Sequence, residues 1–191
     1  MTETPTRNDA WTLLNEYTDN PSLIKHALGV EAAMRAYAEH FGEDVEMWGT
    51  IGLIHDFDYQ QNPTEETHLH VGTKILRDKG WPEEWVLTVA SHADYMGVPR
   101  DSLAAKTLFA VDELSGFLTA CALVRPDKAI ANVKIKSVKK KLKDKAFARG
   151  VNRDDVRSGA EALDVDLGVH IEFVRNAMAT IAAELGLPPS S

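Results

Sequence analysis

Two histidines and two aspartates stand in segments of the chain that are otherwise largely apolar. The pair His55-Asp56 lies in the run TIGLIHDFDY, His26 comes before it, and Asp112 follows within FAVDELSGFL. Burying a polar group without a partner costs about 2–7 kcal/mol, and burying an isolated charge costs more. A shared divalent metal ion would supply the missing counter-charge. The four residues are therefore predicted to meet around a metal ion.

Helical periodicity points these side chains toward the interior. His26 repeats with Leu23 and Val30, and Asp112 follows Leu108 at the spacing of one helical face. Two glycines, Gly49 and Gly52, lie seven and four residues before Asp56 and leave room for another helix, or for an ion, to approach. For each residue alone, a hydrogen-bonded place in the core is the plainer alternative. Four such residues together favour the metal site.

Further histidines fit the same interior site. In HLHVGTKIL, His68 lies one turn before Gly72 on the inward face, whereas His70 falls on the polar face. His92 ends the apolar run WVLTVASH and also faces inward. Two histidines are not assigned to this site and are predicted to be structural or solvent-exposed: His40 and His170.

The elements that must position these residues are all predicted to be helices. Helical periodicity runs nearly throughout the chain, and there is no convincing alternating strand and no repeat. Capping residues and helix-breaking residues predict helices over about residues 7–17, 21–40, 44–56, 65–79, 82–92, 102–124, 135–149 and 153–163, followed by a last helix. That helix carries an apolar stripe, expected to pack on the body of the domain or, alternatively, on a second subunit of a homo-oligomer: Leu167, Ile171, Val174, Met178, Ile181 and Leu185.

The length and composition suit an all-α, single compact domain over residues 1–191, because 44% of the residues are hydrophobic. Residues 20–125 are predicted to form a metal-binding core and residues 126–191 a C-terminal helical extension. The start MTETPTRNDA is polar and no apolar run approaches about 18 residues, so a cytoplasmic protein without a membrane segment is expected. Cys121, in the run FLTACALV, is assigned to the core and not to catalysis.

Positive charge is concentrated in one segment. From Lys134 to Arg153 there are nine Lys and Arg against one acid, so this segment carries +8 and the rest of the chain −16 of the net −8. A nucleic-acid groove would need a broader basic face. We therefore expect a small anionic ligand and no sequence-specific nucleic acid.

Three residues of this basic segment are candidates for substrate binding. On a helix with Val138 on its inward face, Arg149 shares that face, and Lys136 and Lys139 flank it. Arginine offers a planar fork for bidentate phosphate binding, and the lysines supply point charges. A solvated helix face is the equally weighted alternative.

The ordered set His26, His55-Asp56 and Asp112 resembles the HD-domain superfamily of metal-dependent phosphohydrolases, named for that His-Asp doublet. The likeness takes in His68, four residues before a glycine in an HxxxG pattern, and His92, and it covers roughly residues 20–125. The segment KIKSVKKKLKDKAFARGVNR is similar to that of a subgroup of uncharacterised bacterial HD proteins.

The resemblance implies a site for one or two divalent metal ions. In the dinuclear arrangement Asp56 bridges the ions; the ligands completing one are His26, His55 and Asp112, and those of the other are His68 and His92. Imidazoles and carboxylates suit iron, manganese, nickel, cobalt or zinc better than calcium. A metal-bound hydroxide would then attack a phosphorus atom.

The residues after the doublet depart from the family pattern. Many members continue with Ile-Gly, whereas this chain has Phe57-Asp58. Asp58 is a catalytic candidate beside Asp56, because its carboxylate could orient a ligand or accept a proton. Ending the helix is the slightly favoured alternative.

Three classes of function remain open. The first choice is hydrolysis of a phosphoester or phosphoanhydride of a small phosphorylated substrate, with a nucleotide as the commonest class among proteins that the chain resembles. The second is oxidation at a mixed-valence di-iron centre held by the same six ligands. The third is a metal-binding module without turnover. Metal content and phosphate release separate the first two.

Overall fold

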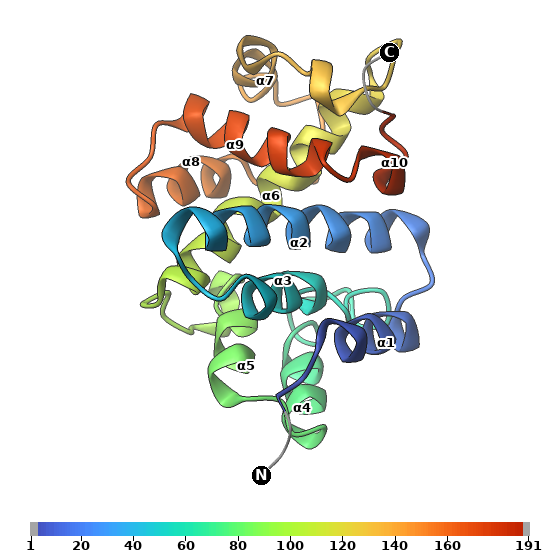
Figure 1. Cartoon of the computed structure of the whole chain (residues 1–191), viewed down its shortest axis with the longest axis vertical. Coiled ribbons are helices and arrows are strands. Elements are labelled where there is room, and N and C mark those ends of the chain that lie inside the picture. The colour runs from blue at the N-terminus through green and yellow to red at the C-terminus, as the bar shows by residue number, and fades with distance from the viewer. Residues whose placement is uncertain (1–3, 189–191) are drawn as a thin grey trace.

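The computed structural model describes residues 4–188, and in that range every regular element is helical (Figure 1). The α-helices are α1 (Arg7–Tyr17), α2 (Pro21–Phe41), α3 (Val45–Ile54), α4 (His70–Asp78), α5 (Glu83–Ala90), α6 (Leu103–Leu123), α7 (Ile135–Lys141), α8 (Arg153–Ala162), α9 (Leu167–Ala179) and α10 (Ala182–Leu185). Short 3-10 turns occur at η1 (Asp94–Met96) and η2 (Ile130–Asn132). The prediction of an all-α fold is confirmed.

Polar caps and a glycine set the ends of the helices that carry the site residues. At the start of α2, the Asn20 side chain accepts a hydrogen bond from the Ser22 amide, and Gly42 ends the helix at φ 74°. The Asp44 side chain caps α3 by accepting from the Met47 amide. These ends agree with the sequence signals because each cap satisfies backbone groups that the helix itself leaves unpaired.

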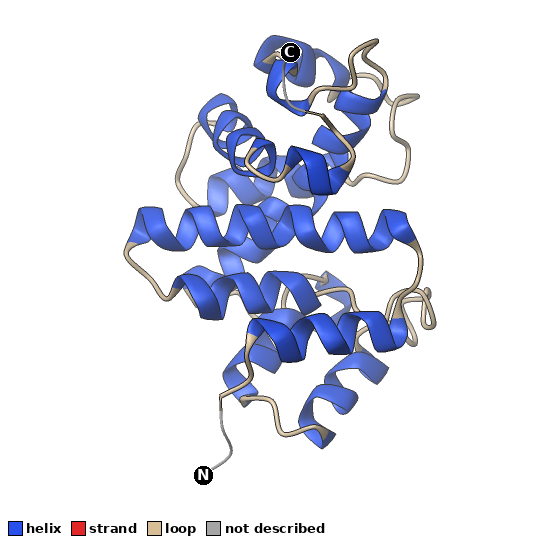
Figure 2. Cartoon of the chain, turned by 45° about the vertical axis from the view of Figure 1, so that its right-hand side comes forward, coloured by secondary structure: helices blue, strands red, loops and turns tan. Residues whose placement is uncertain are grey.

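Helix α2 divides the molecule. Figure 2 shows it crossing the middle, and in Figure 1 α1, α3, α4 and α5 lie on one side of it, α8, α9 and α10 on the other, with α6 passing behind. Helix α2 packs directly on α3, α6 and α9. A Cβ atom added at Gly52 of α3 would lie 3.2 Å from backbone atoms of Val30 and Glu31 in α2. This glycine therefore makes room for a neighbouring helix.

One continuous cluster of buried apolar residues extends from Ala10 to Leu187 and joins both sides of α2. Trp48, Phe57 and Phe117 are among its largest members. Cys121 is buried in it, as expected for a core cysteine. None of the described helices has the length and apolar character that crossing a membrane requires.

His170 links three helices within this core and has no exposed surface. Its Nε2–H donates to the Ala110 carbonyl of α6 over 2.9 Å, so its Nδ1 accepts from the Tyr37 hydroxyl of α2 over 2.6 Å. His40, by contrast, is exposed. Both histidines are placed as the sequence predicted.

Two predicted helices are shorter in the structure. The prediction of a helix from residue 65 is wrong for its first turn, because Leu69 has φ 62° and α4 begins at His70. The prediction of a helix to Arg149 is wrong beyond Lys141. There the Arg153 guanidinium donates to the carbonyls of a loop that includes Asp144 and Val151, which replaces helical hydrogen bonds.

The last predicted helix is divided into α9 and α10 at Thr180 and Ile181. Its stripe still faces the body of the molecule, because Ile171, Val174 and Met178 are buried. Helix α9 packs on α2 and α6.

Candidate metal centre

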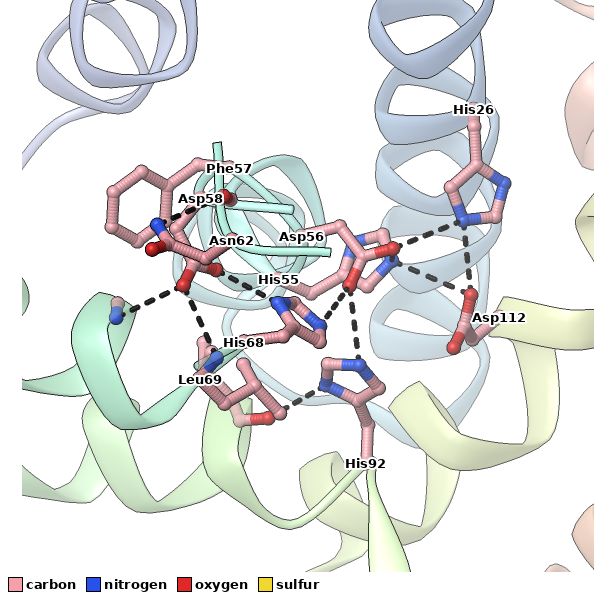
Figure 3. Close-up of polar contacts among 12 residues, drawn as sticks. His26, His55, Asp56, Phe57, Asp58, Asn62, His68, Leu69, His92 and Asp112 are labelled. Carbon is pink, nitrogen blue, oxygen red and sulfur yellow. Dashed lines mark hydrogen bonds and ion pairs between the residues drawn. The ribbon is translucent and has the colours of Figure 1, made fainter. Parts of the chain in front are cut away.

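Five segments converge on one cluster of imidazoles and carboxylates. His26 projects from α2 and Asp112 from α6, while His55 and Asp56 directly follow α3 (Figure 3). The members that come from turns beside helices are His68, before α4, and His92, after α5. Figure 3 shows Asp56 between the pair His26 and Asp112 on one side and the pair His68 and His92 on the other.

The two carboxylate oxygens of Asp56 face different histidines. Its Oδ1 lies 3.1 Å from Nε2 of His68 and 3.3 Å from Nε2 of His92. Its Oδ2 lies 3.5 Å from Nε2 of His55 and 4.0 Å from Nε2 of His26. One carboxylate thus contributes to two separate groups of ligand atoms.

Asp112 completes the first of these groups. Its Oδ1 lies 3.0 Å from Nε2 of His26 and 3.4 Å from Nε2 of His55. Ligand atoms of His26, His55, Asp56 and Asp112 all lie within 4.8 Å of one another, and so do those of Asp56, His68 and His92. The structure therefore brings together all six residues that the sequence assigned to metal binding.

Local backbone geometry fixes two of the imidazole rings. The Nδ1–H of His55 donates to the Gly52 carbonyl over 2.7 Å, and the Nδ1–H of His92 donates to the Val89 carbonyl over 2.7 Å. Both carbonyls belong to the last turn of a helix, where the regular hydrogen bonds run out. Since a carbonyl can only accept, Nδ1 carries the proton and Nε2 of the neutral ring is left as a bare acceptor directed at the carboxylates.

Asp58 fixes the imidazole ring of His68 through the nitrogen that does not face Asp56. Its side chain is fully buried, and its Oδ1 accepts from Nδ1 of His68 over 3.0 Å. Its Oδ2 accepts from the backbone amides of Leu69 at 3.1 Å and Gly72 at 3.0 Å. Of the roles considered for this residue, the structure gives it that of orienting a ligand.

Gly72 is required by this arrangement. A Cβ atom added there would lie 2.7 Å from Cγ of Asp58, closer than real side chains approach. The glycine of the HxxxG pattern therefore leaves the space that the Asp58 carboxylate occupies, and through it the position of His68.

The imidazoles and carboxylates of the cluster shift one another's pKa values. Burial opposes protonation of His55, but Asp56 and Asp112 outweigh it and raise its pKa. Burial likewise opposes protonation of His68, yet the neighbouring Asp56 and Asp58 carboxylates raise its pKa to about 9. Burial would raise the pKa of Asp112, but the imidazoles of His26 and His55 lower it. The carboxylates thus stay ionised and attract positive charge into the site.

The residues fit a transition-metal centre. Nε2 of His55 and Oδ1 of Asp56 are buried and have no hydrogen-bond partner among the described residues. A metal ion placed between these facing atoms would satisfy both of them. The nitrogen and oxygen donors suit iron, manganese, cobalt, nickel or zinc.

A pocket of about 340 Å³ opens beside the cluster. Four of the ligand residues line it, and the remaining lining, which the sequence did not assign to the site, comprises Tyr59, Glu65, Ala93, Asp94, Tyr95, Phe109, Glu113, Asn152 and Asp155. Glu113 and Ala93 directly follow predicted ligands, and Phe109 lies one turn before Asp112 on α6, so local signals could have identified these three. The others come from separate turns and from the start of α8, which helical register does not connect to the site.

Glu113 is held by the C-terminal part of the chain. Its Oε2 accepts from the Asn152 backbone amide over 3.1 Å. Burial and the neighbouring Asp112 carboxylate raise the pKa of Glu113 to about 7. The pocket wall therefore contains a carboxyl group that is poorly compensated by positive charge.

The basic residues predicted to bind substrate do not line this pocket. Lys136, Lys139 and Arg149 are exposed, and none of them is part of the pocket lining. Lys139 instead lies 3.8 Å from the Asp166 carboxylate. The shared face assumed for Arg149 does not exist because α7 ends at Lys141.

The family model described as HD domain matches residues 23–116 of the chain. This range contains all six residues of the cluster. No curated protein and no solved structure matches the chain.

Proposed function

Because residues 23–116 belong to the HD-domain superfamily, we propose that the protein is a metal-dependent phosphohydrolase that cleaves a phosphate ester of a small molecule. The observation that carries the proposal is the position of Asp56. Its two oxygens face two groups of imidazoles, which is the arrangement that a carboxylate bridging two metal ions requires.

The residues that would hold the first ion are His26, His55, Asp56 and Asp112, and those that would hold the second are Asp56, His68 and His92. When bound, divalent ions lower the pKa of a water molecule and neutralise charge on the phosphoryl group.

The chain's own part is to present these groups in a fixed geometry. His55 and His92 are locked by carbonyls of their own helices, and Asp58 acts as a positioning residue for His68. Preorganised ligands need little rearrangement when the ions and the substrate bind. The resemblance implies nucleotides as one class of substrate, and they belong in any screen.

Elemental analysis of the purified protein, followed by phosphate release from a panel of nucleotides and sugar phosphates in Mn²⁺, Co²⁺ or Ni²⁺, tests the proposal. The variant Asp112→Ala removes a carboxylate ligand and should lose both the metal of the first group and phosphate release. Asp101→Ala, an exposed aspartate just before α6, is the control and should retain both. Tightly bound iron with oxygen consumption and no phosphate release would instead favour the oxidative function.

A further inference from the structure

The pocket beside the metal cluster is lined by several carboxylates, and no lysine or arginine among the described residues lines it. Its lining contains six acidic residues: Asp56, Glu65, Asp94, Asp112, Glu113 and Asp155. Asp56 and Asp112 belong to the cluster itself and would be neutralised by metal ions. The other four form an acidic wall that a substrate entering the pocket must face.

Of the four residues of this wall, Asp94 pairs with Arg100, and the other three form no ion pair with any described residue. Of these three, Glu113 accepts its one hydrogen bond from a backbone amide. Arg100 exerts an attractive effect on Asp155, but its guanidinium forms its ion pair with Asp94. Arg100 also stacks on Phe109, with 3.7 Å between its Cζ atom and the ring centroid. Arg100 is therefore engaged by two other residues of the pocket lining, Asp94 and Phe109, and not by Glu113 or Asp155.

Aromatic rings complete the same pocket. Tyr59, Tyr95 and Phe109 line it together with the acidic wall. Rings beside carboxylates form an environment that favours a positively charged group, because the ring face and the carboxylate both attract cations. The same environment repels an additional phosphate.

The size of the pocket limits the substrate further. A volume of about 340 Å³ lies near the lower end of the range of about 300–1,000 Å³ for small-molecule sites. Asp56, which lines this pocket and whose buried Oδ1 has no hydrogen-bond partner, indicates a cation site there that would in turn bind an anion. A substrate with an anionic group beside the metal cluster and a cationic group beside the acidic wall would satisfy both parts of the pocket.

Building on the proposed function, we propose that the substrate is a small phosphate monoester whose alcohol carries an ammonium group, and that Glu113 and Asp155 bind this ammonium group. Hydrolysis forms a bond between a water oxygen and phosphorus and breaks the bond between phosphorus and the alcohol oxygen. One proton of the water passes to that oxygen, so the products are an amino alcohol and inorganic phosphate. Glu113 and Asp155 are specificity-determining residues in this account.

Two esters of matched length provide the test. In 2-aminoethyl phosphate the far end is an ammonium group, and in 2-hydroxyethyl phosphate it is a neutral hydroxyl. With the Mn²⁺-loaded protein, kcat/KM should be higher for the amino ester by about tenfold or more, as expected for one charge-assisted hydrogen bond. Equal values, or faster release from ATP and ADP, would overturn the proposal.

Variants of the acidic wall test which residues cause the preference for the amino ester. Glu113→Gln and Asp155→Asn remove one charge each at nearly constant shape, and in each variant the ratio of the two kcat/KM values should fall toward one. Asp154→Asn is the matched control, because Asp154 adjoins Asp155 in the first turn of α8 but pairs with Arg157 and does not line the pocket. An unchanged ratio in both wall variants would assign the preference to other groups and refute the roles of Glu113 and Asp155.

Calorimetric binding of the two esters separates this inference from the function on which it rests. If no phosphate is released from any compound but the amino ester binds about tenfold more tightly, and Glu113→Gln abolishes the difference, the hydrolase proposal fails and the recognition site stands. If phosphate is released from both esters and they bind equally, the hydrolase proposal stands and the recognition site fails. Circular dichroism of each variant verifies that it is folded.

Discussion

His68 and His70 lie two residues apart, yet only His68 contributes to the metal cluster. The side chain of His68 is buried with Nε2 3.1 Å from Asp56, whereas His70 is exposed at the start of α4. We expect His68→Ala to lose the ion held by Asp56, His68 and His92 while the other ion remains, so metal content should fall from two ions to one. Elemental analysis after dialysis measures this.

His70→Ala is the matched control for that experiment. It removes an imidazole from the same segment without touching the cluster, so its metal content should equal that of the unmodified protein. Equal metal content in the two variants would contradict the assignment of His68 to a second ion.

Gly72 is the residue on which the placement of Asp58 depends. In Gly72→Ala the new Cβ atom would press on a buried carboxylate that holds three hydrogen bonds, so the free energy of unfolding should fall by about 1–3 kcal/mol. Displacement of Asp58 should also weaken binding of the second ion. Urea unfolding and metal titration measure the two effects.

Gly150→Ala provides the comparison for Gly72→Ala. A Cβ atom at Gly150 meets no described atom within 4 Å, and its φ is not positive. Its free energy of unfolding should therefore stay within about 0.5 kcal/mol of the unmodified protein. A similar loss in both variants would mean that the contact with Asp58 is not the cause.

At the residue scale, the clustering of the six candidate ligands was predictable, but their surroundings were not. Types and spacing identified His68 over His70, although the turn that presents His68 depends on Asp58, ten residues away, and on Leu69 with φ 62°. Asp155 joins the pocket only through tertiary packing of α8. Helical periodicity reports which face of a helix is inward, and it does not report which distant helices share one cavity.

At the scale of helices, α9 is joined to α2 and α6 through the buried imidazole of His170. Burial lowers the pKa of His170 below its ordinary value of 6.5, so the folded protein holds the ring neutral. The unfolded chain takes up a proton near pH 6.5 and is stabilised relative to the folded state as the pH falls further. The contribution of His170 is thus fully present above pH 6.5 and declines below it.

Urea unfolding at pH 7.5 and at lower pH tests this for His170→Gln. The variant should lose less stability than the unmodified protein on acidification, because one titrating group that favours the unfolded state is absent; the difference is at most about 1.4 kcal/mol per pH unit. His40→Gln, which changes an exposed histidine, should keep the original pH dependence. Identical pH dependence in His170→Gln would refute the account.

Helix ends were predictable where a local cap sets them, as at Asn20, Gly42 and Ser102. They were not predictable where a distant group replaces the helical hydrogen bonds. Arg153 binds the Asp144 carbonyl in the loop after α7, and Asp58 binds the amides of Leu69 and Gly72 around the start of α4. These contacts span nine or more residues, beyond the range of a capping motif.

At the scale of the whole molecule, the basic segment and the acidic pocket are separate features. Since Lys136, Lys139 and Arg149 do not line the pocket, replacing all three with alanine should leave metal content unchanged and kcat/KM within about twofold. Phosphate release from the preferred substrate measures this. A large increase in KM would restore these residues to substrate binding.

The hydrogen bond from the Asn152 amide to Glu113 joins α8 to the helix that carries Asp112. Asn152 and Asp155 lie outside residues 23–116, although they form part of the pocket wall. If the proposed function holds, selection of the leaving alcohol would therefore depend partly on residues outside the stretch that contains the candidate metal ligands. Exchanging the stretch around α8 for that of a homologue would then change which compounds such an enzyme accepts without changing its metal site.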